Sequence, residues 1–136
     1  MGTTTAITKW TDFYIDGERY LNVIQGGVNK PEKFTPDIIY NLACMTIEKF
    51  FMAYFILIEF LPYNHTLIDL VDSIKEKEYI PEYLEKRLLK MNEYQEICSI
   101  ETYMRTIPQK EDVSLFIEST VMTKKYIDVL IQKHKE

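Results

Sequence analysis

The stretch "ACMTIEKFFMAYFILIEF", from Ala43 to Phe60, is almost entirely apolar but carries the adjacent charged residues Glu48 and Lys49 near its middle. At helical spacing, an arc of about 220° around this segment is apolar. A helix that is apolar over so much of its girth must be covered on more than one side. We therefore predict a central helix from about Pro36 to Leu61, stopped by Pro62. The residues expected to face the core are Ile39, Ala43, Ile47, Phe50, Phe51, Tyr54, Leu57 and Ile58.

The remaining arc of this helix is mixed. Glu48 stands on it, and the apolar side chains of Met45, Met52 and Ile56 stand beside Glu48. Apolar residues next to charges suit a contact face better than a fully solvated one. We therefore predict that Met45, Met52 and Ile56 form a homodimer interface.

Glu48 itself has two interpretations. A carboxylate buried without a partner costs several kcal/mol or shifts its pKa, so Glu48 must be solvated or paired. In the structural interpretation it faces water or a groove, with a basic partner from a neighbouring helix such as Arg87 or Arg105. In the functional interpretation it belongs to a polar pocket.

The rest of the chain predicts about four more helices. The first has an apolar face on which Gly17 would let another helix approach closely, and Gly26 with Gly27 would end it. A third helix begins near Asn64 or Thr66. The faces expected to be buried are Trp10, Phe13, Tyr14, Gly17, Leu21 and Ile24 in the first helix, and Leu67, Leu70, Val71 and Ile74 in the third.

We expect a fourth helix that starts at Pro81 and extends, bent, through Cys98 toward Met104, and a last helix from about Lys110 to Lys133. Their expected core residues are Leu84, Leu88, Met91 and Tyr94 in the fourth, and Val113, Phe116, Ile117, Val121, Ile127 and Leu130 or Ile131 in the last. We predict an all-α, up-and-down antiparallel bundle of about five helices. We expect residues 1–136 to form one domain, with residues 1–8 as a flexible N-terminal tail.

Composition excludes several classes of protein. The formal net charge is -5 and the pI is about 5.1, which argues against non-specific nucleic-acid binding. The start of the chain has no secretory signal pattern. The longest uninterrupted apolar run, "FFMAYFILI", has nine residues, whereas a membrane-spanning helix needs about 20. We expect a cytoplasmic protein with no membrane contact, in which Cys44 and Cys98 are buried, reduced thiols.

The sequence shows no pattern typical of a metal site or of nucleophilic catalysis. Its two histidines, His65 and His134, have no Glu three residues before them, and there is no Cys-x-x-Cys pair. Neither histidine has a predicted Ser or Cys neighbour to activate. We predict no metal and no cofactor.

Several stretches occur in an order typical of one known family. Trp10 opens the first helix, "YNLACMTIEKFFMAYFI" lies in the second, "NHTLIDLVDSI" opens the third, and "ETYMRTIPQ" precedes the last. In this order and spacing the chain resembles the HEPN (higher eukaryotes and prokaryotes nucleotide-binding) family, from about Trp10 to Ile131. Two positions depart from the family pattern, because Met52 stands where many members have Lys and Gly17 where many have Ala.

The resemblance implies a helical bundle that commonly dimerises through its long helices. It also implies RNA cleavage, nucleotide binding, or pairing with a small nucleotidyltransferase in toxin–antitoxin-like modules. Ribonuclease members carry an Arg followed after four to six residues by a His, and no Arg of this chain has a His at that distance. The ligand-binding candidates carried over from the resemblance are Glu48, Lys49, His65 and Arg105.

Two functions therefore stay open. The first is a non-catalytic, dimeric module that binds a nucleotide, a nucleotidyltransferase-type partner, or both. The alternative is an RNA- or nucleotide-phosphate-processing enzyme with a degenerate site, in which Arg105 would stabilise phosphate charge and His65 would transfer protons. A structural helical domain without a ligand is the third reading.

Overall fold

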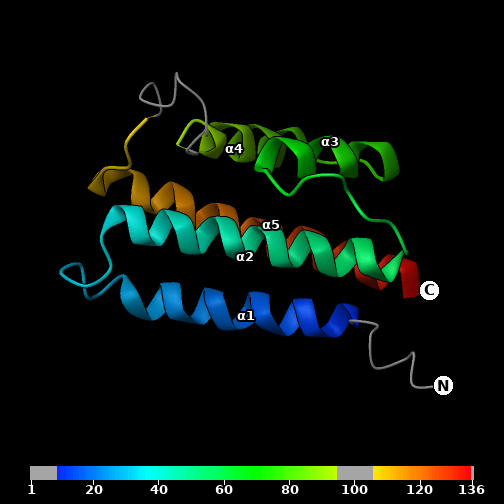
Figure 1. Cartoon of the computed structure of the whole chain (residues 1–136), viewed down its shortest axis with the longest axis horizontal. Helices are drawn as coiled ribbons and strands as arrows, with labels where there is room; N and C mark the ends of the chain where they lie inside the picture. The colour runs from blue at the N-terminus through cyan, green and yellow to red at the C-terminus, as the bar shows by residue number, and fades with distance from the viewer. Residues whose placement is uncertain (1–8, 95–105, 136) are drawn as a thin grey trace.

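The computed structural model describes residues 9–94 and 106–135. This part of the chain is helical, with no strand, and confirms the predicted bundle of five helices (Figure 1). Its elements are α1 (Trp10–Gly27), α2 (Pro36–Leu57), α3 (Leu67–Lys77), α4 (Glu82–Asn92), the 3-10 turn η3 (Lys110–Asp112) and α5 (Val113–Lys135). The tail expected at residues 1–8 lies outside the described residues.

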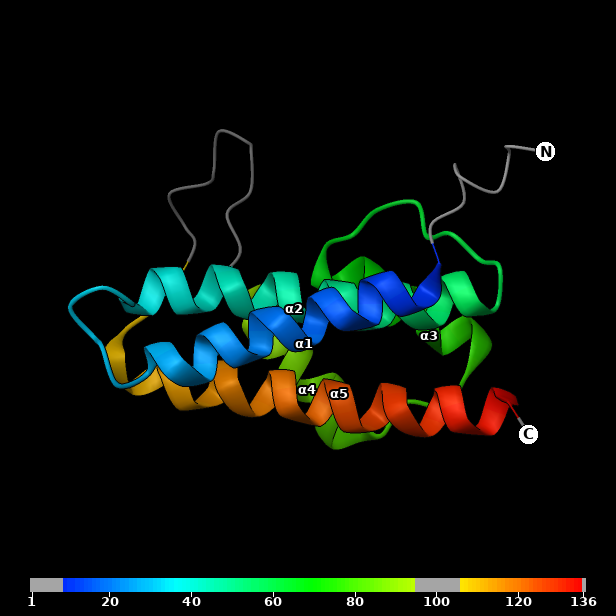
Figure 2. The same cartoon turned by 90° about the horizontal axis from the view of Figure 1, so that it is seen from below.

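The long helices α2 and α5 form the middle of the bundle. Helix α1 packs on one side of them, and the short pair α3 and α4 lies on the other (Figures 1 and 2). Helices α1 and α2 are antiparallel, as are α3 and α4. The connection from α2 to α3 runs back along α2, so that α3 points the same way as α2.

Helix α2 is the central element, as its apolar arc predicts. Ile47, Phe50, Phe51 and Phe55 are fully buried in one core cluster that draws residues from all five α-helices. Of the expected core face, only Leu57 and Ile58, at the end of the helix, are partly exposed. Burying a large apolar side chain contributes about 1.5–3 kcal/mol, so α2 contributes much of the stability of the fold.

Gly17 brings α1 close to α2, as predicted. A Cβ atom placed on Gly17 would lie 2.8 Å from Cε1 of Phe50, too close for a real contact. The missing side chain therefore sets the distance between these two helices. Gly27 is the last residue of α1, and a Cβ there would lie 2.5 Å from Cδ1 of Phe34.

The predicted end of α2 is wrong. The helix ends at Leu57 rather than Leu61, before Pro62 is reached. Glu59 adopts a left-handed backbone conformation with φ of 58°, and the N–H of Phe60 donates to the carbonyl oxygen of Phe55 at 2.8 Å. This pattern closes a helix end by satisfying a free carbonyl, so local backbone geometry terminates the helix ahead of proline.

The other helix ends follow their capping residues. Thr66 rather than Asn64 caps α3, because its Oγ1 accepts the backbone N–H of Asp69 at 3.2 Å. Helix α4 begins directly after Pro81 but ends at Asn92, short of the predicted extension, whose residues from Cys98 to Met104 lie outside the described ranges.

The expected inner faces of α3 and α4 are fully confirmed, whereas in α5 Val113, Ile117 and Val121 are only partly buried. Helix α5 starts at Val113 rather than Lys110, after the 3-10 turn. Across the described ranges, no helix is both long enough and apolar enough to cross a bilayer.

Candidate functional site

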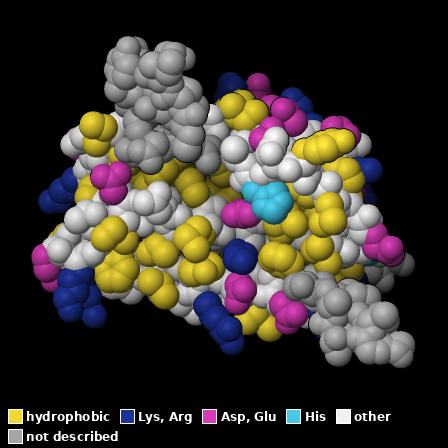
Figure 3. Space-filling model, in the orientation of Figure 1, with side chains coloured by type: hydrophobic (Ala, Val, Ile, Leu, Met, Phe, Trp, Pro, Cys, Tyr) yellow, Lys and Arg dark blue, Asp and Glu magenta, His cyan; other side chains and the backbone are white. Residues whose placement is uncertain are grey.

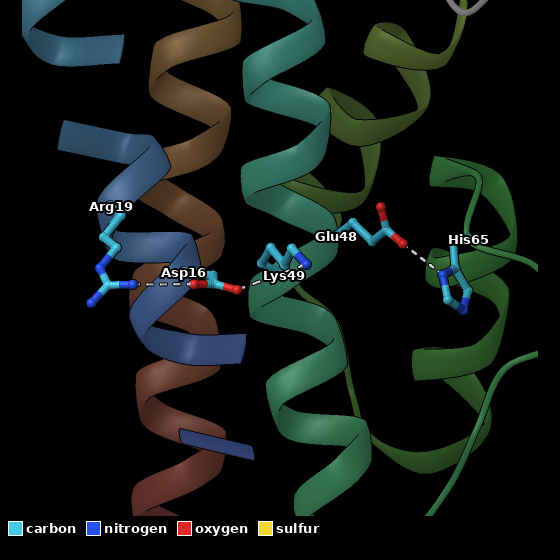
Figure 4. Close-up of polar contacts among 5 residues, drawn as sticks. All are labelled: Asp16, Arg19, Glu48, Lys49 and His65. Atoms are coloured by element: carbon cyan, nitrogen blue, oxygen red, sulfur yellow. Dashed lines mark hydrogen bonds and ion pairs between the residues drawn. The ribbon is translucent and has the colours of Figure 1, made fainter. Parts of the chain in front are cut away.

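Glu48 and Lys49 leave α2 in opposite directions. Figure 4 shows the Lys49 side chain pointing toward α1 and the Glu48 side chain pointing toward the segment that precedes α3. Adjacent residues on a helix stand about 100° apart, so the two charges reach different neighbours. This arrangement explains how an apolar central helix carries two adjacent charges: each lies at an edge of the buried arc and has a partner of opposite charge or matching hydrogen-bonding capacity.

Glu48 pairs with His65. Its Oε2 lies 2.5 Å from Nδ1 of His65, and 33% of the Glu48 side chain is exposed. The α2–α3 connection runs back along α2 and thereby brings His65, just before the cap of α3, to the middle of α2. Two of the residues that the HEPN resemblance singles out therefore meet, although 17 positions separate them in the chain.

The pair uses one of the two ring nitrogens of His65. Nδ1 of His65 faces Glu48, whereas Nε2 makes no hydrogen bond to any described residue. A carboxylate that holds one ring nitrogen orients the imidazole and leaves the other to exchange a proton or to bind. The pair can therefore act as a fixed polar contact for a second molecule at the surface.

Lys49 belongs to a different set of contacts. Its Nζ lies 3.9 Å from Oδ2 of Asp16 and 5.2 Å from the ring centroid of Phe13. Asp16 also faces Arg19 one turn along α1, at 3.7 Å. These contacts tie α1 to α2, so Lys49 is a structural residue here and lies apart from the Glu48–His65 pair. Sequence reasoning missed Asp16, whose only signal is its spacing of one turn from Arg19.

The predicted interface strip is only partly exposed. Met45 is 39% exposed and Ile56 is half-buried. The expectation that Met52 lies on this strip at the surface is wrong, since only 4% of it is exposed and it belongs to the core. The segment between α2 and α3 folds back over this side of α2, which the helical period of α2 alone does not predict.

A mixed surface surrounds the pair. Figure 3 shows hydrophobic side chains gathered on this face, on both sides of a histidine that lies beside acidic and basic side chains. At the N-terminal end of α2, Ile38 is exposed and Leu42 is partly exposed, both on the same strip as Met45. We call the face formed by Ile38, Leu42, Met45, Ile56, Glu48 and His65 the α2 face.

Arg87, one of the two predicted basic partners of Glu48, pairs with another residue. Arg87 faces Glu118 at 3.8 Å. Arg105 lies outside the described ranges, so the joint site of Arg105 and His65 stays a prediction. The partner found, His65, was predicted as a site residue but not as the partner of Glu48.

The surroundings of Cys44 keep its thiol protonated and so unreactive. Burial raises the pKa of the Cys44 thiol to about 11, so the reactive thiolate is scarce near neutral pH. The expected burial of Cys44 is only partial. Cys98, the other thiol expected to be buried, is not among the described residues. Within residues 9–94 and 106–135, no cluster of His, Cys, Asp or Glu could hold a metal ion.

A second polar network links α1 to α5 and was also missed. The hydroxyl of Tyr14 donates to Asp128, which pairs with Lys124 at 3.1 Å. Lys124 also reaches Glu18 at 3.9 Å. Only the i, i+4 spacing of Lys124 and Asp128 is visible in the sequence. Because these groups satisfy one another, we assign the network to holding α1 against α5.

No family model matches this sequence, and neither a curated protein nor a solved structure matches it. The function is therefore inferred from the arrangement of the residues and from the HEPN resemblance.

Proposed function

We propose that this chain is a non-catalytic helical interaction module that forms a homodimer through the α2 face. One observation supports this proposal above the others: exposed Met45 and half-buried Ile56 flank a carboxylate–imidazole pair that is already formed. Apolar side chains pack at the centre of an interface, and a fixed polar pair sets its register.

Self-association tests this proposal. We expect sedimentation equilibrium to show a dimer at tens of micromolar, and Met45→Glu to shift it to monomer, because a carboxylate would be buried without a partner. Leu89→Glu is the matched control, since Leu89 on α4 is also 39% exposed and lies outside the α2 face. A wild-type protein that stays monomeric, or a Met45→Glu protein as dimeric as Leu89→Glu, would contradict the proposal.

The HEPN resemblance supports a finer proposal about the partner. We infer that the dimer works with a nucleotidyltransferase-type protein in a toxin–antitoxin-like module, or binds a nucleotide, with Glu48 and His65 as contacts. Co-expression with the product of the neighbouring reading frame tests the first part, and calorimetric titration with ATP and GTP tests the second. We expect His65→Ala to weaken whichever binding is found. If this variant binds as tightly as the wild type, the Glu48–His65 pair is not part of the binding site.

A further inference from the structure

A second surface lies where the α3–α4 connection passes beside the C-terminal half of α5 (Figure 2). A groove with a volume of about 360 Å³ opens there. One wall carries Tyr79, Pro81 and Tyr83, and the other carries Lys125, Val129 and Lys133 of α5. None of these residues belongs to the α2 face.

The groove exposes large apolar side chains together. Tyr79 is 79% exposed, Val129 64% and Tyr83 56%. Single exposed apolar residues are normal, but several in one hollow mark a contact site. Tyrosine is also among the residues that contribute most to binding energy at interfaces.

The walls are held in place by internal contacts. The hydroxyl of Tyr126, at the base of the groove, donates to the carbonyl oxygen of Tyr79 at 2.7 Å. Glu78 accepts a hydrogen bond from buried Tyr54 and lies 4.0 Å from Nζ of Lys133. A groove whose backbone is fixed in advance loses little conformational entropy when it binds.

The α5 wall is positively charged. Lys125, Val129 and Lys133 recur every four residues and so form one stripe along the helix. Lys125 makes no ion pair with any residue that the structure describes. Glu78 is the acidic residue in the lining, and its oxygens already face Tyr54 and Lys133. The stripe therefore presents net positive charge opposite the tyrosine wall.

The carboxylates just outside the groove are also engaged. Glu85 accepts from Nζ of Lys75 at 2.9 Å, and Glu82 faces Lys86 at 3.6 Å. Neither carboxylate pairs with Lys125, so its charge is uncompensated. An acidic group on a ligand would therefore be complementary to the α5 wall.

We propose that this groove binds an extended, proline-containing segment of another protein that carries acidic residues. Proline rings pack on tyrosine faces, and an extended proline-rich segment is ordered before it binds. Its backbone carbonyl groups can accept hydrogen bonds from the hydroxyls of Tyr79 and Tyr83, which have no partner among the described residues. Its carboxylates would face Lys125 and Lys133.

Fluorescence polarisation with labelled peptides tests this proposal. The first peptide has a run of prolines flanked by glutamates. In the second, alanines replace the prolines, and in the third, lysines replace the glutamates. We expect saturable binding of the first peptide, with both others weaker by about tenfold, the change that one well-packed contact or charge pair produces. Equal binding of all three peptides, or no binding at millimolar peptide, would overturn the proposal.

Matched variants locate the binding. Tyr79→Ala and Tyr83→Ala should each weaken the first peptide at least tenfold, whereas Tyr63→Ala, at a fully exposed tyrosine outside the groove, should not. Lys125→Glu should weaken it, and Lys33→Glu, at an exposed lysine in the α1–α2 loop, should leave it nearly unchanged. Circular dichroism confirms that each variant is folded.

Two outcomes separate this groove from the α2 face. Met45→Glu should retain peptide binding even when it abolishes the dimer, so either proposal can fail without the other. If Tyr79→Ala instead abolishes self-association and the wild type binds no peptide, a second copy of the chain occupies the groove and the peptide proposal is overturned.

Discussion

At the scale of single residues, Glu48 and Lys49 show how much depends on one step along a helix. The two side chains sit about 100° apart, so one reaches His65 and the other reaches Asp16. Their charges could be recognised as an anomaly in an apolar segment. The partner of each charge could not be predicted in this way, because both partners come from other segments of the chain.

The Glu48–His65 pair should contribute little to the stability of the monomer. Because both side chains are partly exposed, we expect Glu48→Gln to change the free energy of unfolding by less than about 1 kcal/mol. Urea denaturation at a concentration where the protein is monomeric measures this. A loss of several kcal/mol would mean that the pair serves the fold rather than a partner.

Glu59 adopts a backbone conformation that costs free energy in the folded protein. With φ of 58° it occupies the left-handed region, where a side chain costs about 1 kcal/mol relative to glycine. We expect Glu59→Gly to raise the free energy of unfolding by up to about 1 kcal/mol. Lys125→Gly in the middle of α5 is the control, because Lys125 is exposed and makes no ion pair with any described residue; it should lower the same quantity by a similar amount. Destabilisation by Glu59→Gly would show that its side chain has a role that outweighs the strain.

At the scale of elements, the contact between α1 and α2 depends on Gly17. We expect Gly17→Ala to lower the free energy of unfolding by about 1–3 kcal/mol, because the added methyl group meets the ring of Phe50. Gly26→Ala is the matched control in the same helix: no atom lies within 4 Å of the added carbon, so it should be neutral or stabilising. Thermal unfolding of both variants tests this expectation, and equal changes in their stability would contradict the close approach of α1 to α2.

In helix α5, the apolar pattern predicts only part of the buried face. Its apolar pattern predicts burial of Phe116 and Ile127, which the structure confirms. The fully buried Ser119 and Thr120 were not expected. Their hydroxyls donate to the backbone carbonyls of Leu115 at 2.7 Å and Ile117 at 2.6 Å. A hydroxyl that is hydrogen-bonded within its own helix can be buried at a small cost in free energy, so the polarity of the residue alone does not predict its burial.

At the scale of the whole molecule, three buried or half-buried acidic side chains link stability to pH. Burial raises the pKa of Cys44 to about 11, and burial with the hydrogen bond to Glu78 raises the pKa of Tyr54. Burial also raises the pKa of Tyr126. All three groups are neutral in the folded protein at neutral pH, and the unfolded chain would release their protons first as the pH rises.

We therefore expect the free energy of unfolding to fall as the pH is raised from about 8.5 to 11, because the unfolded state then binds fewer protons than the folded one. Urea denaturation at several pH values measures this, and Cys44→Ala should reduce the slope near the lower end of the range. Stability that stays constant up to pH 11 would contradict the burial of these groups.

The sequence by itself determined the all-α class, the five helices, the central position of α2 and the close approach at Gly17. These features follow from the period of apolar residues and from the size of a side chain, which act locally along each helix. Tertiary structure alone decided that Met52 is buried, that Glu48 meets His65, and that tyrosines and lysines face each other across a groove. These contacts depend on the connection that folds back after Leu57 and on the α3–α4 connection that passes beside α5. Contacts between distant segments are set by the path of the chain, so the apolar period of either segment does not predict them.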